Sequence, residues 1–496
     1  MILEVGVIVN KKYILFLLSL FFLLFYIWYD NYKFKDNFLI GGILDDSFKN
    51  EIIQTRTLYS KHLDLYYSNS KIPYVSNEDY YLLSTLNKDN FYENILNYDG
   101  FKMRVFSEND NWIELLIYNE KYYNILKLQL TNLPVLTITK KEEDKKYSYM
   151  MLYEPNLENT VVKKNQIIYD LRGGTAIYSN KKSYKLEVIG NMKKEKKVSF
   201  LGMKKDSNWI LNPLWFDSSY VREKVSYDIW NGISDMYQHN MEYVELVIDN
   251  DYKGIYCLQE KVDLETFDAK KNSLLISVKY WEEDIDDPKL FREDFVLKSD
   301  FVDRYQFEEG IVNNNSLRLE ILRSFVNSVN EENTSLKIKY DFDNSVNYNL
   351  FINLIMASDN TSKNQKILFR KENDSYIVVK TPWDLDYSFG NEKIDVNFSD
   401  SGLYKDTLLP SSLRDNKKFY SAMKDKYFKL RKSIYNEEWI SNKIEEYISL
   451  LSYSALSRDV RRWNNHNFED SVDIVKLSLL EQIDFLDQYF GGNHEV

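Results

Sequence analysis

The stretch that decides the fold is Tyr376-Ile-Val-Val-Lys-Thr-Pro-Trp-Asp-Leu-Asp-Tyr-Ser-Phe-Gly390. Its first part, Tyr376–Lys380, is an apolar run that predicts a strand. Two carboxylates, Asp384 and Asp386, follow the strand two positions apart. Carboxylates are oxygen ligands for magnesium, and two of them among large apolar residues repel each other unless a cation lies between them. A solvated aspartate pair is the alternative, but the apolar neighbours favour a magnesium site that binds a phosphate.

A second acidic motif lies upstream in Ser358-Asp-Asn-Thr-Ser-Lys-Asn364, between a predicted helix over Val346–Ala357 and an apolar run. Asp359 and Asn364 are five positions apart. Protein kinases use this spacing in their catalytic loop, where the aspartate orients the attacking hydroxyl and the asparagine binds magnesium. Because both residue types are common in loops, an ordinary turn is the alternative. Asp384 follows Asp359 by 25 residues.

The surrounding sequence predicts an α+β fold, with strands before helices. Tyr243–Ile248 alternates with period two, and after a turn the run Ile255–Val262 completes an antiparallel hairpin. Strand-like alternation also occurs at 101–106 and 112–118. Asp217 is placed to cap a helix whose apolar face carries Val221, Val225 and Ile229. Beyond residue 316 the pattern is mostly helical, over Leu317–Val326, Val346–Ala357, Lys417–Ile434, Glu437–Tyr453 and Ser471–Tyr489.

In their order and spacing, the two acidic motifs resemble those of the CotH kinase family, a group of spore-coat protein H-like atypical protein kinases. The resemblance covers roughly residues 131–490, and its Pro-Trp-Asp-x-Asp-x-x-x-Gly element is highly specific. Where the family usually has Asn-Ser after Arg-Gly, this chain has Gly-Thr. Further elements in the family's order are Arg172-Gly-Gly-Thr175, Lys181-Lys-Ser-Tyr-Lys185-Leu-Glu-Val, Leu201-Gly-Met, Asp206-Ser-Asn-Trp209, Arg222-Glu-Lys224, Gly254-Ile-Tyr-Cys-Leu-Gln-Glu260-Lys261 and Asp459-Val-Arg-Arg-Trp463.

The resemblance implies an atypical protein-kinase-like bilobal fold, with ATP bound between a strand-rich N-lobe and a helical C-lobe. Asp359 would be the catalytic aspartate. Asp384 would be the principal ligand of Mg²⁺ or Mn²⁺, with Asn364 and Asp386 as further ligands. Phosphoryl transfer depends mainly on positioning and on neutralising the transferred group, which suits acids, a metal and a lysine.

The resemblance also implies which residues contact the nucleotide. Lys185 is the first choice for the catalytic lysine because it lies on a predicted strand after a glycine-containing turn, and Lys182 is the alternative. Arg222 would support the site from its helix, and Glu223 is one possible ion-pair partner for the lysine. The predicted nucleotide contacts are Arg172, Gly173, Lys182, Lys185, Glu260 and Lys261, the last two at the end of the hairpin.

Composition and charge exclude several other classes of protein. The 496 residues include 64 Lys and Arg against 76 Asp and Glu, a net charge of −12, which disfavours a nucleic-acid binder. A lone cysteine, Cys257, rules out disulfide scaffolds, zinc ribbons and iron–sulfur clusters, and its apolar neighbours predict burial. The four histidines are scattered, and none forms the i, i+4 pair of a zincin helix.

The N-terminus predicts a single-pass membrane anchor. Residues Tyr13–Tyr29 carry no charge and are followed by Asp30-Asn-Tyr-Lys33, which lacks the small residues of a signal-peptidase site. A cleaved signal peptide is the alternative. Lys11 and Lys12 lean slightly toward a cytoplasmic N-terminus, which would put the main domain outside the cytoplasm. The predicted domains are an anchor over 1–35, a small region of unknown role over 36–130 and a CotH-like domain over 131–490.

These observations predict a membrane-anchored kinase that transfers the γ-phosphoryl group of ATP to Ser or Thr hydroxyls, with a spore-coat or cell-envelope protein as acceptor. A non-catalytic scaffold for coat or envelope assembly is the alternative from another class. A kinase for a carbohydrate or lipid is the third possibility, because the sequence does not define the acceptor pocket.

Overall fold

The computed structural model describes residues 74–75, 80–84, 102–118, 123–140, 146–155, 161–173, 178–234, 238–278, 305–391, 402–451, 453–464 and 467–492. The fold mixes strands and helices, as predicted. The chain forms two compact units, Met1–Leu130 with Asn156–Thr160, and Thr131–Pro155 with Val161–Val496. Each unit is described by itself below.

The first unit contains a five-stranded sheet in the order β1-β2-β5-β4-β3. The predicted alternation at 112–118 is confirmed, since Ile113 and Leu115 are buried while Glu114 between them is half-buried. The β1–β2, β3–β4 and β4–β5 pairs are antiparallel. The strands are β1 Tyr74–Val75, β2 Tyr80–Ser84, β3 Lys102–Glu108, β4 Trp112–Tyr118 and β5 Tyr123–Thr131.

The second unit begins with a closed barrel in the order β10-β12-β11-β6-β7-β8-β9. Alternate residues fill its interior, among them Leu136, Leu186 and Leu258. The predicted hairpin is confirmed as the antiparallel pair β11–β12, with Cys257 buried as expected. The strands are β6 Val135–Lys140, β7 Ser148–Glu154, β8 Val161–Arg172, β9 Ser183–Ile189, β10 Asn208–Asn212, β11 Met241–Ile248 and β12 Asp251–Glu260.

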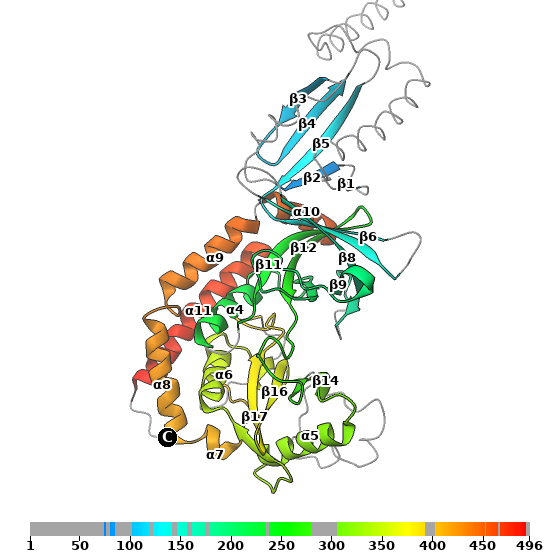
Figure 1. The fold of residues 1–496 in the computed structure, drawn as a ribbon. Coiled ribbons are helices and arrows are strands. Elements are labelled where there is room, and N and C mark those ends of the chain that lie inside the picture. Colours follow the sequence, from blue (N-terminus) through cyan, green and yellow to red (C-terminus); the bar gives the residue numbers. More distant parts are fainter. Residues whose placement is uncertain are drawn as a thin grey trace, which may run out of the picture. The chain divides into compact units, whose positions relative to one another are not determined.

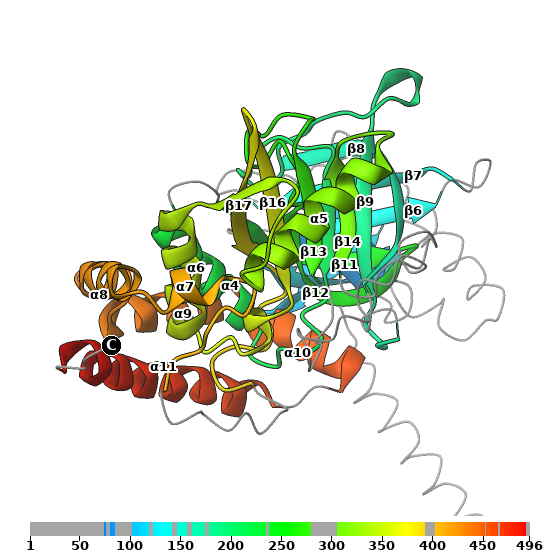
Figure 2. The same ribbon diagram turned by 90° about the horizontal axis from the view of Figure 1, so that it is seen from below.

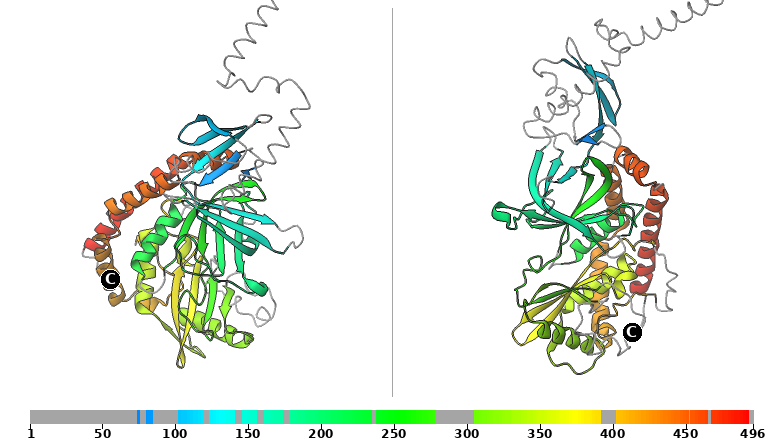
Figure 3. Two further views of the ribbon diagram at one scale, coloured as in Figure 1. Left: turned by 45° about the horizontal axis from the view of Figure 1, so that its top comes forward. Right: turned by 90° about the vertical axis from the view of Figure 1, so that its right-hand side faces the viewer.

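A second sheet follows in the order β14-β13-β16-β17-β15, and Figure 3 shows it in yellow and green, separate from the barrel. Beyond residue 316 the chain is mostly helical, as predicted, but β15, β16 and β17 also lie there and join β13 and β14 in this sheet. Helix α5, Asn315–Val329, packs across the sheet through Ile321 and Phe325 (Figure 2). The strands are β13 Leu274–Val278, β14 Tyr305–Gly310, β15 Lys337–Tyr340, β16 Gln365–Glu372 and β17 Ser375–Pro382.

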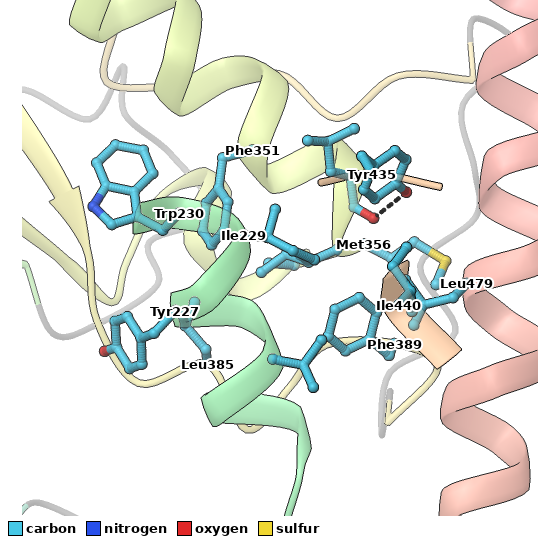
Figure 4. Close-up of a cluster of buried hydrophobic side chains, with 14 of the residues drawn as sticks. Tyr227, Ile229, Trp230, Phe351, Met356, Leu385, Phe389, Tyr435, Ile440 and Leu479 are labelled. Carbon is cyan, nitrogen blue, oxygen red and sulfur yellow. Dashed lines mark hydrogen bonds between the residues drawn. The ribbon is translucent and has the colours of Figure 1, made fainter. Parts of the chain in front are cut away.

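The remaining helices share one large apolar core, part of which is drawn in Figure 4. The predicted helix after Asp217 is confirmed, and its Val221, Val225 and Ile229 are fully buried. Leu385 and Phe389 pack into the same core, so their side chains fix the acidic loop after β17 to the helices. The helices are α4 Arg222–Ile233, α6 Phe342–Leu354, α7 Ser411–Arg414, α8 Lys417–Arg431, α9 Glu437–Leu451, α10 Tyr453–Trp463 and α11 Phe468–Gly491.

Helix α10, which the sequence analysis did not predict, lies against β12 (Figure 1). Its Asp459 accepts hydrogen bonds from Lys181 Nζ at 2.9 Å and from Ile255 N at 2.6 Å. A Cβ at Gly254 would lie 1.9 Å from Asp459 Oδ1, so only glycine permits this approach. Arg458 adds a buried ion pair with Glu245 at 2.6 Å.

No helix in the described part of the chain is long and apolar enough to cross a bilayer. The predicted anchor over 13–29 lies outside the described residues.

Candidate functional site

The first acidic motif forms a tight turn between α6 and β16. Asp359 begins a 3₁₀ turn, Asp359–Thr361, and its side chain is buried. Lys363 Nζ lies 2.7 Å from Asp359 Oδ2, so a cation neutralises this carboxylate from within the loop. Asn364 ends the turn with a left-handed backbone, φ 52°. Asparagine tolerates this conformation better than most residues do.

The second acidic motif leaves the end of β17 and turns sharply at Asp384, which also has a left-handed backbone, φ 59°. Asp384 is exposed to solvent, whereas Asp386 is buried. Strained residues of this kind persist only where their surroundings hold them, and they cluster at functional sites. Here the buried Leu385 and Phe389 hold the loop.

Hydrogen bonds join the two motifs directly. Asn360 Nδ2 donates to the carbonyl oxygens of Asn364, at 2.7 Å, and Trp383, at 3.0 Å. Trp383 N donates to the Asn364 carbonyl oxygen at 2.9 Å. The structure thus brings Asp359, Asn364 and Asp384 together, although they come from separate loops. Asn360, which the sequence analysis did not single out, is the residue that fastens them.

Glu223, from the first turn of α4, completes an acidic cluster with Asp384 and Asp386. Carboxylate oxygens of the three residues lie within 4.8 Å of one another. Burial, and then the charge of Asp384, raise the pKa of Glu223 to about 8, and the same two causes raise the pKa of Asp386 well above its usual range. Although Asp384 is partly open to solvent, desolvation by the surrounding protein raises its pKa, and the charge of Arg172 opposes this shift. The three carboxylates carry like charges that repel one another, and their oxygen atoms are hard donors. Both properties fit a divalent cation.

The sequence analysis named Glu223 only as one possible ion-pair partner of the lysine, and did not predict its place in this cluster. In the structure its side chain accepts a hydrogen bond from Asn212 Nδ2 at 2.7 Å. Arg222 does support the acidic loop, because its Nε donates to the Ser388 carbonyl oxygen at 3.1 Å and its guanidinium pairs with Asp217 at 2.7 Å.

Arg172 lies at the end of β8, with its guanidinium 5.4 Å from the centre of the Trp383 ring. Gly173 follows with φ 100°, while Gly174 and Thr175 lie outside the described residues. In the β8–β9 ladder Arg172 pairs with Ser183 and Asp170 with Lys185, so Lys185 lies on the same face as Arg172.

Lys185 itself is 62% exposed, with Asp170 Oδ2 at 3.6 Å. The structure shows no direct contact between Lys185 and the acidic cluster among the described residues. Lys182 is half-buried, and its carbonyl oxygen accepts a hydrogen bond from Tyr256 at 2.9 Å. Which lysine binds phosphate stays a prediction.

Glu260 and Lys261 line a pocket of about 330 Å³ at the end of the hairpin. Lys204 N donates to Glu260 Oε1 at 2.9 Å, and burial raises the pKa of Glu260. The other lining residues are Lys204, Lys205, Asp206, Gln238, Asn240, Asp263, Glu265 and Thr266.

The ion pair of Lys366 and Glu308, 2.7 Å apart, is influenced by charges of both the pocket and the acidic cluster. Burial alone would raise the pKa of Glu308, but Lys366 and Lys261 lower it. Lys366 also lies 5.0 Å from the centre of the Trp383 ring, next to Asp384. Lys366 also lowers the pKa of Asp384, so its charge acts both on Glu308 and on the acidic cluster.

The fold and this cluster define an α+β protein in which three carboxylates lie close enough together to coordinate one metal ion. The family model for the CotH kinase protein matches residues 170–481, most of the chain, so the chain belongs to the CotH kinase family. The predicted resemblance is confirmed. None of the curated proteins matches this chain.

Proposed function

We propose that this chain is a membrane-anchored kinase that transfers the γ-phosphoryl group of ATP to Ser or Thr hydroxyls of a spore-coat or cell-envelope protein. In this proposal the barrel is the N-lobe of a kinase-like fold, and the second sheet with its helices is the C-lobe. Family membership supports the kinase-like phosphotransferase class. The acceptor and the membrane anchor rest on the sequence.

One observation carries the proposal. The loop of Asp359 and the loop of Asp384 are fastened to each other through Asn360, while Asp386 and Glu223 lie in the same cluster. A catalytic aspartate and a metal site must be held at a fixed separation for in-line transfer, and hydrogen bonds to backbone carbonyl groups provide this rigidity.

Each residue then has a separate task. Asp384, Asp386 and Asn364 would hold Mg²⁺ or Mn²⁺, which supplies charge neutralisation for the phosphates when bound. Asp359 would orient the acceptor hydroxyl and accept its proton. Lys363, paired with Asp359, lies where it can offset the charge of the transferred group.

The nucleotide would extend from this cluster toward Glu260 and Lys261, with Arg172 and Gly173 beside its phosphates. Lys185→Ala should then weaken ATP binding without loss of stability, because the side chain is largely exposed. Calorimetric titration of ATP with Mg²⁺ measures this, and Lys182→Ala is the matched variant. Unchanged affinity for Lys185→Ala with a loss for Lys182→Ala would move the role to Lys182.

The decisive test of function is an assay with γ-labelled ATP and Mg²⁺ or Mn²⁺, read out first as autophosphorylation and then on coat or envelope proteins. We expect the labelled phosphate to be transferred to protein only when the metal is present, and to be found on Ser or Thr side chains. Binding of the metal–nucleotide without transfer to any protein, sugar or lipid would favour the scaffold instead.

A further inference from the structure

Glu223 belongs to the acidic cluster, yet the proposed function gives it no task. Its side chain is 3% exposed, and it projects from the first turn of α4. One carboxylate oxygen accepts the hydrogen bond from Asn212 at 2.7 Å. The other carboxylate oxygen has no hydrogen-bond donor among the described residues. An ionised carboxylate this deeply buried with a single hydrogen bond is costly unless it takes up a proton or a cation lies beside it. Two further carboxylates within 4.8 Å favour the cation.

The neighbouring cations are committed elsewhere. Arg222 pairs with Asp217 at 2.7 Å, and Lys224 Nζ lies 3.3 Å from Glu242. No described lysine or arginine forms an ion pair with Glu223. Its charge is therefore not neutralised by direct contact with a basic side chain of the described part of the chain.

The charges around the cluster leave a deficit. Five carboxylates act on one another here, and three basic groups stand against them, while Lys366 is matched by Glu308 at 2.7 Å. With all five acids ionised, the balance is two negative charges, the charge that one divalent cation neutralises. The acids are Asp217, Glu223, Asp359, Asp384 and Asp386, and the basic groups are Arg172, Arg222 and Lys363.

We propose that Glu223 is a third carboxylate ligand of the divalent-cation site, and that the protein consequently binds the cation before it binds nucleotide. This inference rests on the proposed function and adds to it. Magnesium in nucleotide sites is usually held by one or two carboxylates together with substrate phosphates. A third carboxylate supplies the oxygen ligand and the negative charge that the phosphates would otherwise supply, so the cation can bind without nucleotide.

The test is titration of Mn²⁺ into the full-length protein without nucleotide. Binding is measured by calorimetry or by the loss of the electron paramagnetic resonance signal of free Mn²⁺. Glu223→Gln keeps the length of the side chain and an acceptor for Asn212, but removes the charge. We expect it to weaken Mn²⁺ binding roughly ten- to hundredfold, as changes around metal sites do. Glu242→Gln makes the same chemical change nearby and should leave the affinity unchanged.

Three outcomes would overturn the inference, and they differ in what else fails. If Glu223→Gln binds Mn²⁺ like the parent while Asp384→Asn does not, Glu223 is not a ligand and the kinase proposal stands. If the parent binds Mn²⁺ only together with ATP, the nucleotide-free site is absent and the kinase proposal again stands. If the parent binds neither Mn²⁺ nor Mn²⁺–ATP, both proposals fail together.

Discussion

At the scale of single residues, the two motif loops depend on backbone conformations that most residues avoid. Asn364 and Asp384 both have positive φ. Their neighbours fix them by hydrogen bonds from Asn360 and Trp383 and by burial of Leu385. The side chains are therefore presented at set positions before any ligand arrives, which reduces the reorganisation needed during transfer.

Asp359→Asn should separate transfer from binding. The substitution keeps the size of the side chain but removes the group that accepts the hydroxyl proton in the proposed mechanism, a contribution of about 10²–10⁴ in rate. Binding of metal–ATP should stay close to normal. Calorimetry and labelled-phosphate transfer measure the two properties, and Asp384→Asn is the contrast, because it should lose metal-dependent ATP binding. Parental transfer rates in both variants would contradict the kinase proposal.

His239 should make stability depend on acidity. The buried His239 ring lies between two aromatic rings, with its centre 4.2 Å from that of Tyr227 and 5.5 Å from that of Trp383. Burial lowers the pKa of His239 to about 3. Below about pH 6.5 the unfolded chain takes up a proton that the folded chain refuses until about pH 3, so stability falls as the pH falls through this window, by up to about 1.4 kcal/mol per unit.

Urea unfolding at pH 7.5 and pH 5 checks this effect in the parent and in His239→Gln. The variant lacks the titrating group, so the difference between its two free energies of unfolding should be smaller than that of the parent. Equal differences in the two proteins would show that His239 does not contribute to the acid sensitivity.

At the scale of elements, α10 contacts the barrel side of the molecule through a buried ion pair between Asp459 and Lys181. Lys181 is 2% exposed and Asp459 1% exposed. Burial lowers the pKa of Lys181, while Asp459 favours its charged form. Such a pair is stabilising only while both partners are present.

Asp459→Asn should therefore destabilise the protein by about 3–5 kcal/mol, because it leaves the Lys181 ammonium buried beside a neutral amide. Chemical unfolding of the variant measures the loss. Adding Lys181→Met to the same protein removes the unpaired charge and should recover part of the stability. No recovery in the double variant would mean that the hydrogen bonds donated to Asp459 by Ile255 N and by the Tyr220 hydroxyl, rather than the charge pair, are the important contacts.

The elements also show what the sequence could and could not predict. The β11–β12 hairpin and α4 follow from local periodicity and were predicted, because each pattern lies within one short segment. The β13–β16 pairing joins residues 274–278 to residues 365–369, and no local pattern specifies it. The acidic loops were predicted from their motifs, whereas Glu223 was not placed with them, since only the packing of α4 brings it there.

At the scale of the whole molecule, the predicted anchor over 13–29 should decide where the chain resides in the cell. Removing residues 1–35 should move the protein from the membrane fraction to the soluble fraction, while the parent resists extraction with alkaline carbonate. Protease added to intact cells should digest the parent, given a cytoplasmic N-terminus. Full protection of the parent would reverse the predicted orientation, and an unchanged distribution of the truncated chain would contradict the anchor.

The contact between Lys181 and Asp459 also sets the order of events during synthesis. The two residues are 278 positions apart, so the ribosome must translate nearly the whole chain before the lysine meets its partner. At roughly 5–20 residues per second this interval lasts on the order of 14–56 s. Even after β12 has completed the barrel, the Lys181 ammonium group lacks its carboxylate partner until α10 is translated. The barrel therefore reaches its final state only after translation of α10, and nascent chains stalled before Asp459 should be digested by protease at the barrel.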